Sequence, residues 1–292
     1  MKVLVFDQLH HKNRIGLELL FRHMQVEYVF TTDDSKIIDP SFDIIYSPAN
    51  AIDSSKYPLQ KFIFGPHFSI FPNHKLTAIK NTHKNSIYIQ PSEWCVEKWK
   101  ERGVTNVLPI TYFPFPVDVE RFSPEIMNKK EKVFIYFKRR KPDELYFIKS
   151  FLQHRGFEFA VFDYVARYDE KHYLEYLQQA KFGIILGAHE SQGFAIQEAL
   201  SCNVPLIVWN VRSMNQEVGM NYTNIKATSI GYWDSRCGEY FHDYHELEET
   251  FRIFMDKLET TETYQPREFI MEHVSVEPCA KRFMELFSSM YI

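Results

Sequence analysis

The sequence predicts two α/β domains in tandem, and three observations lead to this fold class. The chain has 292 residues, too many for one typical small domain and enough for two at about 150 residues each. Short apolar runs rich in Val, Ile, Phe and Tyr alternate with amphipathic stretches of helical length, the pattern of parallel strands joined by crossover helices. The pattern breaks once, near residues 125 to 131, where prolines and a charged run occur in TYFPFPVDVERFSPEIMNKKEK.

The first predicted domain comprises residues 1–127 and contains about six strands. The strand stretches are VLVF, EYVF, DIIY, KFIF, SIYI and NVLPI. Helical stretches, IGLELLFRHM and SEWCVEKWKERG, lie between some of them. Ser92 is the predicted N-cap of the second helix, and Gly103 is its predicted end.

The second predicted domain comprises residues 128–265, and residues 266–292 are expected to form a C-terminal helix. The predicted strands are KVFIYF, FEFAVF, FGIIL and PLIVW. The predicted helices between them are DELYFIKSFLQHRG, EKHYLEYLQQA and GFAIQEALSC. The last segment, VEPCAKRFMELFSSMY, has the periodicity of an amphipathic helix.

Composition and charge exclude several classes of protein. A net charge of -4 argues against a protein that coats nucleic acid. No segment reaches the ~18 to 20 apolar residues of a membrane span, and the apolar run at the amino terminus, VLVF, is too short for a signal peptide. Four widely spaced cysteines, Cys95, Cys202, Cys237 and Cys279, predict reduced thiols rather than a zinc site or disulfides. We expect a soluble, cytoplasmic protein with no nucleic-acid partner and no membrane span.

The stretch HESQGFAIQEALSCNVPLIV permits two interpretations, of which the first is a serine hydrolase. HESQG differs by one residue from the G-x-S-x-G elbow, with Ser191 as the nucleophile after a predicted strand. Asp234 and either His242 or His245 would complete a triad in the order Ser, Asp, His. His189 argues against this interpretation, because it stands where the first glycine of the elbow should be and brings a Cβ and an imidazole into a crowded turn.

In the second interpretation Gly193 opens a helix that binds an anion. Backbone N–H groups at a helix amino terminus are unpaired and lie at the positive end of the helix dipole, and a glycine allows close approach. Glu190 precedes the helix, and Glu198 lies inside it with its side chain tilted toward the amino end. Because carboxylates repel phosphate, both glutamates would face hydroxyls. A nucleotide-sugar, with phosphate in the middle and a sugar at each side, has this shape.

The same stretch resembles a motif of the retaining glycosyltransferases of GT-B fold. Their second domain carries E-x(7)-E within a pattern like hEgfGlaxxEAmaxGxPvv. The matching positions are Glu190, Gly193, Glu198, Ala199 and Pro205. The sequence departs from the pattern at Asn203, where the family usually has glycine.

Further stretches resemble the family in the same order, so that the likeness covers roughly residues 86 to 210. EYLQQAKFGIIL resembles the preceding helix and strand, QPSEWCVEKWKERGVTNVLPI resembles the vpSewxxxxxxxxGv segment, and PVDVERFSP resembles the interdomain GVDxxxFxP. The family's Gly-Gly turn after the first strand is missing from FDQLHHKNRIG, which leaves the acceptor unassigned. The resemblance also implies that the final helix packs back on the first domain through Phe283, Leu286 and Met290.

The resemblance implies a GT-B fold, with two Rossmann-like domains facing a cleft. The activity it implies is transfer of a sugar from a nucleoside diphosphate-sugar to a saccharide or other hydroxyl acceptor, with retention and by a front-face mechanism. It assigns the donor sugar hydroxyls to Glu190, the ribose to Glu198, and the diphosphate to backbone amides around Gly193 and Phe194. The serine hydrolase and a non-catalytic nucleotide-sugar binding protein remain as alternatives.

No metal or further cofactor is expected, because no Asp-x-Asp occurs in the chain. Side-chain cations must then stabilise the charge that develops on the diphosphate. FKRRKPDE follows the predicted strand KVFIYF, at the carboxyl end where α/β sheets bind ligands. Lys138 and Arg140 are the favoured cations, since they share one direction if the strand continues. A solvated basic loop is the alternative.

His67 is the second candidate catalytic residue beside Glu190. It follows the predicted strand KFIF, and the enzymes that the sequence resembles have a cleft histidine close to the donor sugar in this region. A histidine that is merely hydrogen-bonded within a loop is the alternative. His10 and His11, on the first loop, are secondary candidates.

Overall fold

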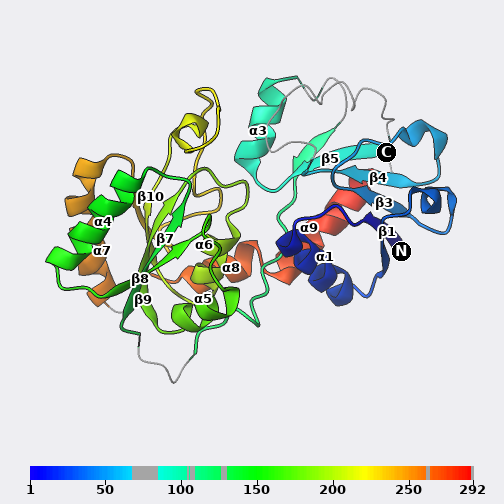
Figure 1. The fold of residues 1–292 in the computed structure, drawn as a ribbon. Helices are drawn as coiled ribbons and strands as arrows, with labels where there is room; N and C mark the ends of the chain where they lie inside the picture. Colours follow the sequence, from blue (N-terminus) through cyan, green and yellow to red (C-terminus); the bar gives the residue numbers. More distant parts are fainter. Residues whose placement is uncertain (68–84, 104, 106–108, 126–129, 261–263, 291–292) are drawn as a thin grey trace. The chain divides into compact units, whose positions relative to one another are not determined.

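The computed structural model describes residues 1–67, 85–103, 105, 109–125, 130–260 and 264–290. They form two compact units, one of Met1–Asp118 with Val274–Ile292 and one of Val119–His273 (Figure 1). The four cysteines are buried as free thiols. Within the described ranges, no helix has both the length and the apolar character that crossing a membrane requires.

The first unit is built on a six-stranded parallel sheet in the order β2-β1-β3-β4-β5-β6. Its strands are β1 (Lys2–Phe6), β2 (Glu27–Thr31), β3 (Ile44–Ser47), β4 (Lys61–Phe64), β5 (Ser86–Gln90) and β6 (Ile110–Tyr112). All pair in parallel register. Five of the six strands predicted from apolar runs in this part of the chain are confirmed. The sixth, NVLPI, shares only Ile110 with β6, and its residues 106–108 lie outside the described ranges.

Helices cover the faces of this sheet, and both faces are apolar. The helices are α1 (His11–His23), α3 (Glu93–Glu101) and α9 (Val276–Ser289), with short turns η1 (Asp34–Ile38) and η2 (Ser54–Lys56) between strands. Trp99 of α3 packs with one face of the sheet, which includes Phe62 and Phe64. On the other side α9 packs on α1, with the rings of Phe21 and Phe283 5.7 Å apart. The predicted contact residues of α9, Phe283, Leu286 and Met290, are buried.

The second unit contains a five-stranded parallel sheet in the order β11-β10-β9-β7-β8. The strands are β7 (Lys132–Lys138), β8 (Phe159–Asp163), β9 (Ala180–Gly187), β10 (Leu206–Trp209) and β11 (Gly238–Phe241). The central strands, β7 and β9, are almost continuously buried. Their uninterrupted apolar character follows from helices on both faces of a parallel sheet.

The helices of the second unit form two layers around this sheet. They are α4 (Pro142–His154), α5 (Glu170–Leu177), α6 (Phe194–Ser201), α7 (Leu247–Glu259) and α8 (Pro266–His273), with turns η4 (Met214–Gln216) and η5 (Tyr244–Glu246). Helices α4 and α7 lie on one side of the sheet, and α5 and α6 lie on the other (Figure 1). The rings of Phe151 and Phe251 join α4 to α7 at 5.1 Å, and Tyr173 of α5 lies 4.9 Å from Phe162 of β8.

The chain enters the second unit earlier than the sequence predicts. The predicted first domain extends to residue 127, whereas the first unit extends to Asp118. The residues after Asp118 pack on the second unit, where the Ser201 hydroxyl donates to the carbonyl of Phe122 (2.6 Å). The Arg267 guanidinium donates to the carbonyl of Val119 (3.2 Å). The chain therefore passes from the first unit to the second after Asp118, before the end of the proline-rich and charged stretch from which the boundary was predicted.

The chain also returns to the first unit later than the sequence predicts. Helix α8 lies within the predicted terminal segment 266–292 but belongs to the second unit, where it packs on α6. The return begins at Val274, whose carbonyl accepts a hydrogen bond from the N–H of Val117 (2.9 Å). The segment that rejoins the first unit is therefore α9 and the residues directly before it.

Candidate functional site

The carboxyl ends of β7 and β9 form the topological switch point of the second unit. The connection from β7 leads to β8 on one side, whereas β9 lies on the other side of β7 and is followed by β10. Loops diverge at such a point, and ligands of open α/β sheets bind there. Lys138 and Gly187 are partners at this edge. The residues that the sequence singled out, in FKRRK and HESQG, directly follow these two strands.

An ion pair joins the two strand ends. Lys138 Nζ donates to both Oε1 and Oε2 of Glu190 at 2.8 Å. Both side chains are largely shielded from solvent, and the backbone N–H of Glu190 donates to the carbonyl of Thr228 (3.0 Å). The ring of Tyr164, which is 39% exposed, lies 4.6 Å from Lys138 Nζ. A carboxylate and an ammonium group thus stand together at the switch point.

Gly193 begins helix α6 in the left-handed conformation, with φ of 85°. Glycine adopts this conformation without the steric penalty of a Cβ. No side chain caps this helix start, so the first-turn amides from Phe194 onward lack the partner that an N-cap side chain gives. A Cβ at Gly193 would approach Glu190 Cβ to 3.4 Å. The conformation suits an anion-binding turn, and the donor-binding role of Gly193 and Phe194 stays a prediction.

Glu198 lies buried inside α6, among tyrosines. Burial and then the charge of Glu198 raise the pKa of Tyr168. Burial also raises the pKa of Tyr136, with a smaller contribution from Glu190. These phenols therefore stay protonated and can act as hydrogen-bond donors. The two glutamates of the E-x(7)-E pattern thus lie near tyrosine hydroxyls.

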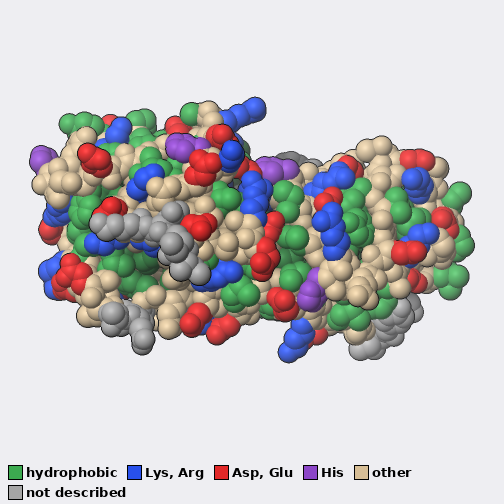
Figure 2. Space-filling model, turned by 90° about the horizontal axis from the view of Figure 1, so that it is seen from below, with side chains coloured by type: hydrophobic (Ala, Val, Ile, Leu, Met, Phe, Trp, Pro, Cys, Tyr) green, Lys and Arg blue, Asp and Glu red, His purple; other side chains and the backbone are tan. Residues whose placement is uncertain are grey.

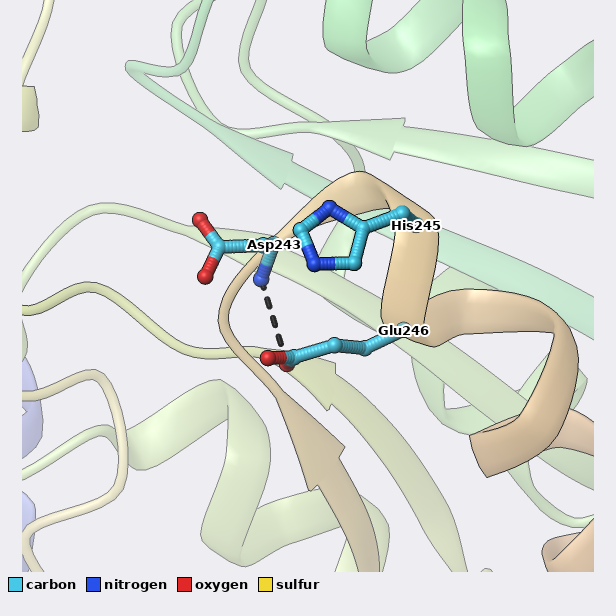
Figure 3. Close-up of side chains that lie close together, drawn as sticks. All are labelled: Asp243, His245 and Glu246. Carbon is cyan, nitrogen blue, oxygen red and sulfur yellow. Dashed lines mark hydrogen bonds between the residues drawn. The ribbon is translucent and has the colours of Figure 1, made fainter.

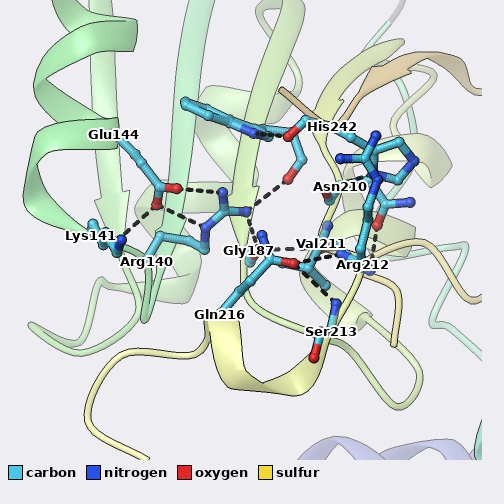
Figure 4. Close-up of polar contacts among 12 residues, drawn as sticks. Arg140, Lys141, Glu144, Gly187, Asn210, Val211, Arg212, Ser213, Gln216 and His242 are labelled. Atoms are coloured by element: carbon cyan, nitrogen blue, oxygen red, sulfur yellow. Dashed lines mark hydrogen bonds and ion pairs between the residues drawn. The ribbon is translucent and has the colours of Figure 1, made fainter. Parts of the chain in front are cut away.

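Arg140 does not continue the direction of β7, which corrects the sequence prediction. Strand β7 has ended, and Arg139 adopts a left-handed conformation with φ of 50°, which breaks the alternation of side chains. Arg140 is 2% exposed. It donates to both carboxylate oxygens of Glu144 (2.9 and 2.8 Å) and to the carbonyls of Gly187 (3.2 Å) and Trp209 (3.0 Å) (Figure 4). These contacts connect the carboxyl ends of β9 and β10 to α4. Arg140 therefore has a structural role, and we do not include it in the proposed donor site.

Arg139 is the other cation at this edge. Its side chain is 42% exposed, and its Nη1 donates to Oε1 of Glu217 at 2.6 Å. The other oxygen of Glu217, Oε2, lies 3.1 Å from His189 Nδ1. Burial, followed by the charges of Lys138 and Arg139, lowers the pKa of His189 to about 4. The sequence favours Lys138 and Arg140 within the basic cluster FKRRK over Arg139, and it gives no indication of Glu217. Glu217 lies in the irregular segment between β10 and β11, and its charge is the only property in the sequence that could have drawn attention to it.

The hydrogen bonds do not support the hydrolase interpretation. Asp234 accepts from the guanidinium of Arg236 (2.8 Å). His242 Nδ1 lies 3.1 Å from the carbonyl oxygen of Asn210. These two triad candidates are thus hydrogen-bonded to groups outside the proposed triad. Ser191 also does not share the positive φ of the strained backbone positions, although the nucleophile of an elbow sits on a strained turn.

One cluster of potential metal ligands, Asp243, His245 and Glu246, occurs among the described residues (Figure 3). Glu246 Oε2 accepts from the backbone N–H groups of His242 (2.8 Å) and Asp243 (3.3 Å). The Asp243 carboxylate accepts from Arg212 (2.7 Å). These contacts form the capping box of η5, so the carboxylates are explained by local structure.

His67 lies near the switch point of the first unit, between β1 and β3. Its backbone N–H donates to the carbonyl of Pro48 (2.7 Å), directly after β3. Its Nε2 lies 3.2 Å from Asn13 Nδ2 and accepts from the N–H of His10 (3.4 Å). Burial lowers the pKa of His67, which favours the neutral ring that can accept these bonds. His10 itself caps α1, and its ring lies 4.4 Å from that of His11.

The surface carries charges of both signs. On the face of the molecule shown in Figure 2, acidic and basic side chains are interspersed over the described residues. The cations discussed above, Lys138 and Arg139, are both paired with carboxylates.

Comparisons with known proteins identify the fold. No protein-family model matches the chain, and no characterised protein matches it in sequence. Solved structures do match. Sucrose-phosphate synthase from Thermosynechococcus elongatus is 12% identical with a TM-score of 0.60, covering 99% of this chain and 98% of that chain. The lipopolysaccharide outer core galactosyltransferase WaaB is 11% identical with a TM-score of 0.56, covering 99% of this chain and 100% of that chain.

The catalytic domain of starch synthase IV from Arabidopsis thaliana, bound to ADP and acarbose, is a further match. It is 10% identical, has a TM-score of 0.54, and the match covers 95% of this chain and 76% of that chain. The chain therefore has the GT-B glycosyltransferase fold, as predicted from the sequence. At this level of identity the likeness concerns the fold, and activity has to be argued from the site.

Proposed function

We propose that the protein is a glycosyltransferase that moves a sugar from a nucleoside diphosphate-sugar to a saccharide or other hydroxyl acceptor, with retention and without a metal ion. The observation that carries the proposal is the position of Glu190. Its carboxylate, paired with Lys138, lies at the switch point of a GT-B second domain and directly precedes the Gly193 helix start. A donor with a diphosphate between two sugars matches this sequence of groups.

Each group of the site has a role in this proposal. The amides at Gly193 and Phe194 bind the diphosphate at the amino terminus of α6. Glu190 accepts hydrogen bonds from hydroxyls of the donor sugar, and Glu198 accepts them from the ribose. Both carboxylates are acceptors only, which suits hydroxyl donors.

Lys138 supplies positive charge where the leaving diphosphate gains negative charge. Arg139 takes the place that the sequence prediction gave to Arg140, because its guanidinium is partly exposed at the same edge of the sheet. A preorganised cation contributes most in a site that excludes water. Side chains thereby supply the electrostatic stabilisation of the leaving diphosphate that a metal ion can supply in other enzymes.

His67 is the proposed catalytic residue of the first unit. A neutral imidazole whose Nε2 accepts from Asn13 and His10 carries its proton on Nδ1, and this N–H can donate a hydrogen bond to a sugar hydroxyl group. Burial lowers the pKa of His67 and so maintains this neutral form. The bonds from Asn13 and His10 hold the ring in place. We place the activity in the cytoplasm, where free thiols such as the four cysteines persist.

Two structural neighbours support the donor class. Starch synthase IV was solved with ADP and acarbose, and a pneumococcal O-GlcNAc transferase, GtfA, was solved with UDP and GlcNAc. Both ligand sets pair a nucleoside diphosphate with a saccharide. For this chain the base, the sugar and the acceptor are the variables that an experiment must assign.

A thermal-shift screen against UDP-, GDP-, ADP- and TDP-sugars tests the proposal. A ligand that binds the folded state raises the melting temperature according to its affinity. We expect one donor to give a clear shift, and release of its nucleoside diphosphate to follow on incubation. Binding without donor hydrolysis or transfer would instead favour the non-catalytic binding protein. Labelling of Ser191 by a fluorophosphonate would favour the hydrolase.

A further inference from the structure

We infer that Glu217 is a positioning residue for glycosyl transfer, which acts by holding the side chain of Arg139 at the donor site. The inference rests on the proposed function and adds a third carboxylate to the E-x(7)-E pair. Glu217 lies in the irregular segment between β10 and β11, yet its side chain is only 5% exposed. A carboxylate in a loop is usually solvated, so its burial calls for a structural reason.

The two carboxylate oxygens of Glu217 contact different residues, one that follows β7 and one that follows β9. Oε1 accepts from Arg139 Nη1 (2.6 Å), directly after β7. Oε2 lies 3.1 Å from Nδ1 of His189, which directly precedes Glu190 after β9. The next residue, Val218, donates its backbone N–H to the carbonyl of Arg139 (2.9 Å). Glu217 and Val218 thus fix both the side chain and the main chain of Arg139.

The backbone of Arg139 shows that this fixation is needed. Its φ of 50° is in the left-handed region, where a non-glycine residue is strained and persists only when surrounding contacts determine it. The charge-assisted bond to Glu217 and the backbone bond from Val218 are such contacts. They hold the guanidinium of Arg139 against Glu217, at the carboxyl end of β7.

The segment that carries Glu217 is itself rigid. Ser213 and Lys226 form an antiparallel bridge, and the side-chain oxygen of Gln216 accepts from the backbone N–H groups of Arg212 (2.6 Å) and Ser213 (3.0 Å) (Figure 4). Met214 is fully buried beneath this turn. The carboxylate is therefore presented from a preorganised turn, as a positioning group requires.

The expected effect is on the chemical step. Negative charge develops on the diphosphate as the bond to the sugar breaks, and a cation that is fixed in advance stabilises it without reorganisation. Without Glu217 the guanidinium of Arg139 is not held in advance, so its ordering adds to the barrier of the chemical step. Loss of Glu217 should therefore lower kcat more than donor affinity, and it should do so only through Arg139.

A double-mutant cycle of Glu217→Gln and Arg139→Met tests the inference, with donor hydrolysis or transfer as the assay. We expect each single variant to lower kcat about tenfold to a hundredfold while the donor KM changes by less than about threefold. The double variant should be no slower than Arg139→Met alone, because residues that act as a unit are not additive. The matched control is Glu239→Gln, which removes a carboxylate paired with Lys257 (2.5 Å) at the amino end of β11. It should leave kcat unchanged.

Several outcomes would overturn the inference. An unchanged kcat in Glu217→Gln would do so, as would an equal further loss in the Arg139→Met background. If Glu217→Gln does not fold, Glu217→Asp can replace it, because it keeps the charge at a shorter reach. Its kcat should be lower than that of the wild type, and the same substitution should have no further effect in the Arg139→Met background. Additive losses in an active enzyme reject only the role of Glu217. A wild-type protein that turns over no donor rejects the proposed function, and this inference with it.

Discussion

Lys138 Nζ donates to both carboxylate oxygens of Glu190 at 2.8 Å. This pair settles a difficulty of the proposed site, because a carboxylate beside a diphosphate would repel it. At this separation an opposite charge offsets most of the carboxylate's field. In the proposed site this pairing would allow Glu190 to face sugar hydroxyls without repelling the diphosphate.

Glu190→Gln should lower turnover by about one to three orders of magnitude. In the proposed mechanism the contacts of Glu190 with sugar hydroxyls tighten as the glycosidic bond breaks, so their loss should remove ~1.4 to 4 kcal/mol of transition-state stabilisation. Initial rates of sugar transfer at saturating donor measure the effect. Thermal denaturation serves as the control for folding, because the substitution also breaks the pair with Lys138. A properly folded variant with wild-type kcat would contradict the role of Glu190.

Glu198→Gln should act mainly on donor affinity. A ribose is bound similarly before and during the reaction, and a loss of such uniform binding appears chiefly in KM. Steady-state kinetics with varied donor concentration give the separation of KM from kcat. Glu198 is buried, so the melting temperature has to be compared as well.

Ser191→Ala is the matched control for both glutamates, since it lies in the same motif. It should change activity little, by one hydrogen bond worth about 0.5 to 1.5 kcal/mol at most. The hydrolase interpretation gives the opposite order, with Ser191 essential and Glu198 dispensable. An inactive Ser191→Ala variant together with a fully active Glu198→Gln variant would contradict the glycosyltransferase proposal.

The sequence predicted the fold better than it predicted the direction of side chains at the candidate site. Periodicity identifies buried parallel strands, and the E-x(7)-E pattern places Glu190 and Glu198 around Gly193. The prediction of Arg140 failed because it assumed that β7 continues, whereas Arg139 takes a left-handed φ. No local pattern signals that conformation.

Glu217 could not have been predicted for a related reason. Its contacts with Arg139 and His189 join positions far apart in the chain. They depend on the path of an irregular loop, which sequence periodicity does not describe. The division of the chain into units also depends on hydrogen bonds such as that from Ser201 to Phe122, which composition does not reveal.

Activity should survive EDTA. The proposed stabilisation of the diphosphate comes from Lys138, Arg139 and the amino terminus of α6, none of which a chelator removes. Lys138→Met should in contrast lower kcat about a hundredfold or more, as for removal of a group that stabilises developing charge. Transfer rates with and without EDTA, and with added Mn²⁺ or Mg²⁺, measure the dependence. Loss of activity on chelation that either ion restores would refute this prediction.

Gly238→Ala should strongly destabilise the second unit. Gly238 begins β11 with φ of 133°, and a Cβ there would lie 1.9 Å from the carbonyl oxygen of Leu206 in the neighbouring strand. Backbone atoms of a buried strand cannot move aside, so the loss should reach at least about 3 kcal/mol. Gly156→Ala is the control, since its Cβ would meet nothing within 4 Å and only the positive φ is strained; it should lose about 1 to 2 kcal/mol. Equal unfolding midpoints in urea would contradict the argument.

The stability of the second unit should fall as the pH falls from about 6.5 toward 4, and His189 should cause part of the loss. Burial and the neighbouring cations lower the pKa of His189 from 6.5 in the unfolded chain to about 4 in the folded one. Between these values the unfolded state binds more protons, so the free energy of unfolding increases with pH and is fully present above 6.5. The full difference in the free energy of unfolding corresponds to about 3 kcal/mol.

Urea unfolding at about pH 7 and about pH 4.5 measures the effect of pH on the free energy of unfolding. His189→Gln should reduce the difference between the two pH values, whereas the exposed His154→Gln should not. Burial also lowers the pKa of His67, which lies in the first unit, and the comparison of variants isolates the contribution of His189. Identical pH dependence in the wild type and His189→Gln would show that this histidine is not held neutral by the fold.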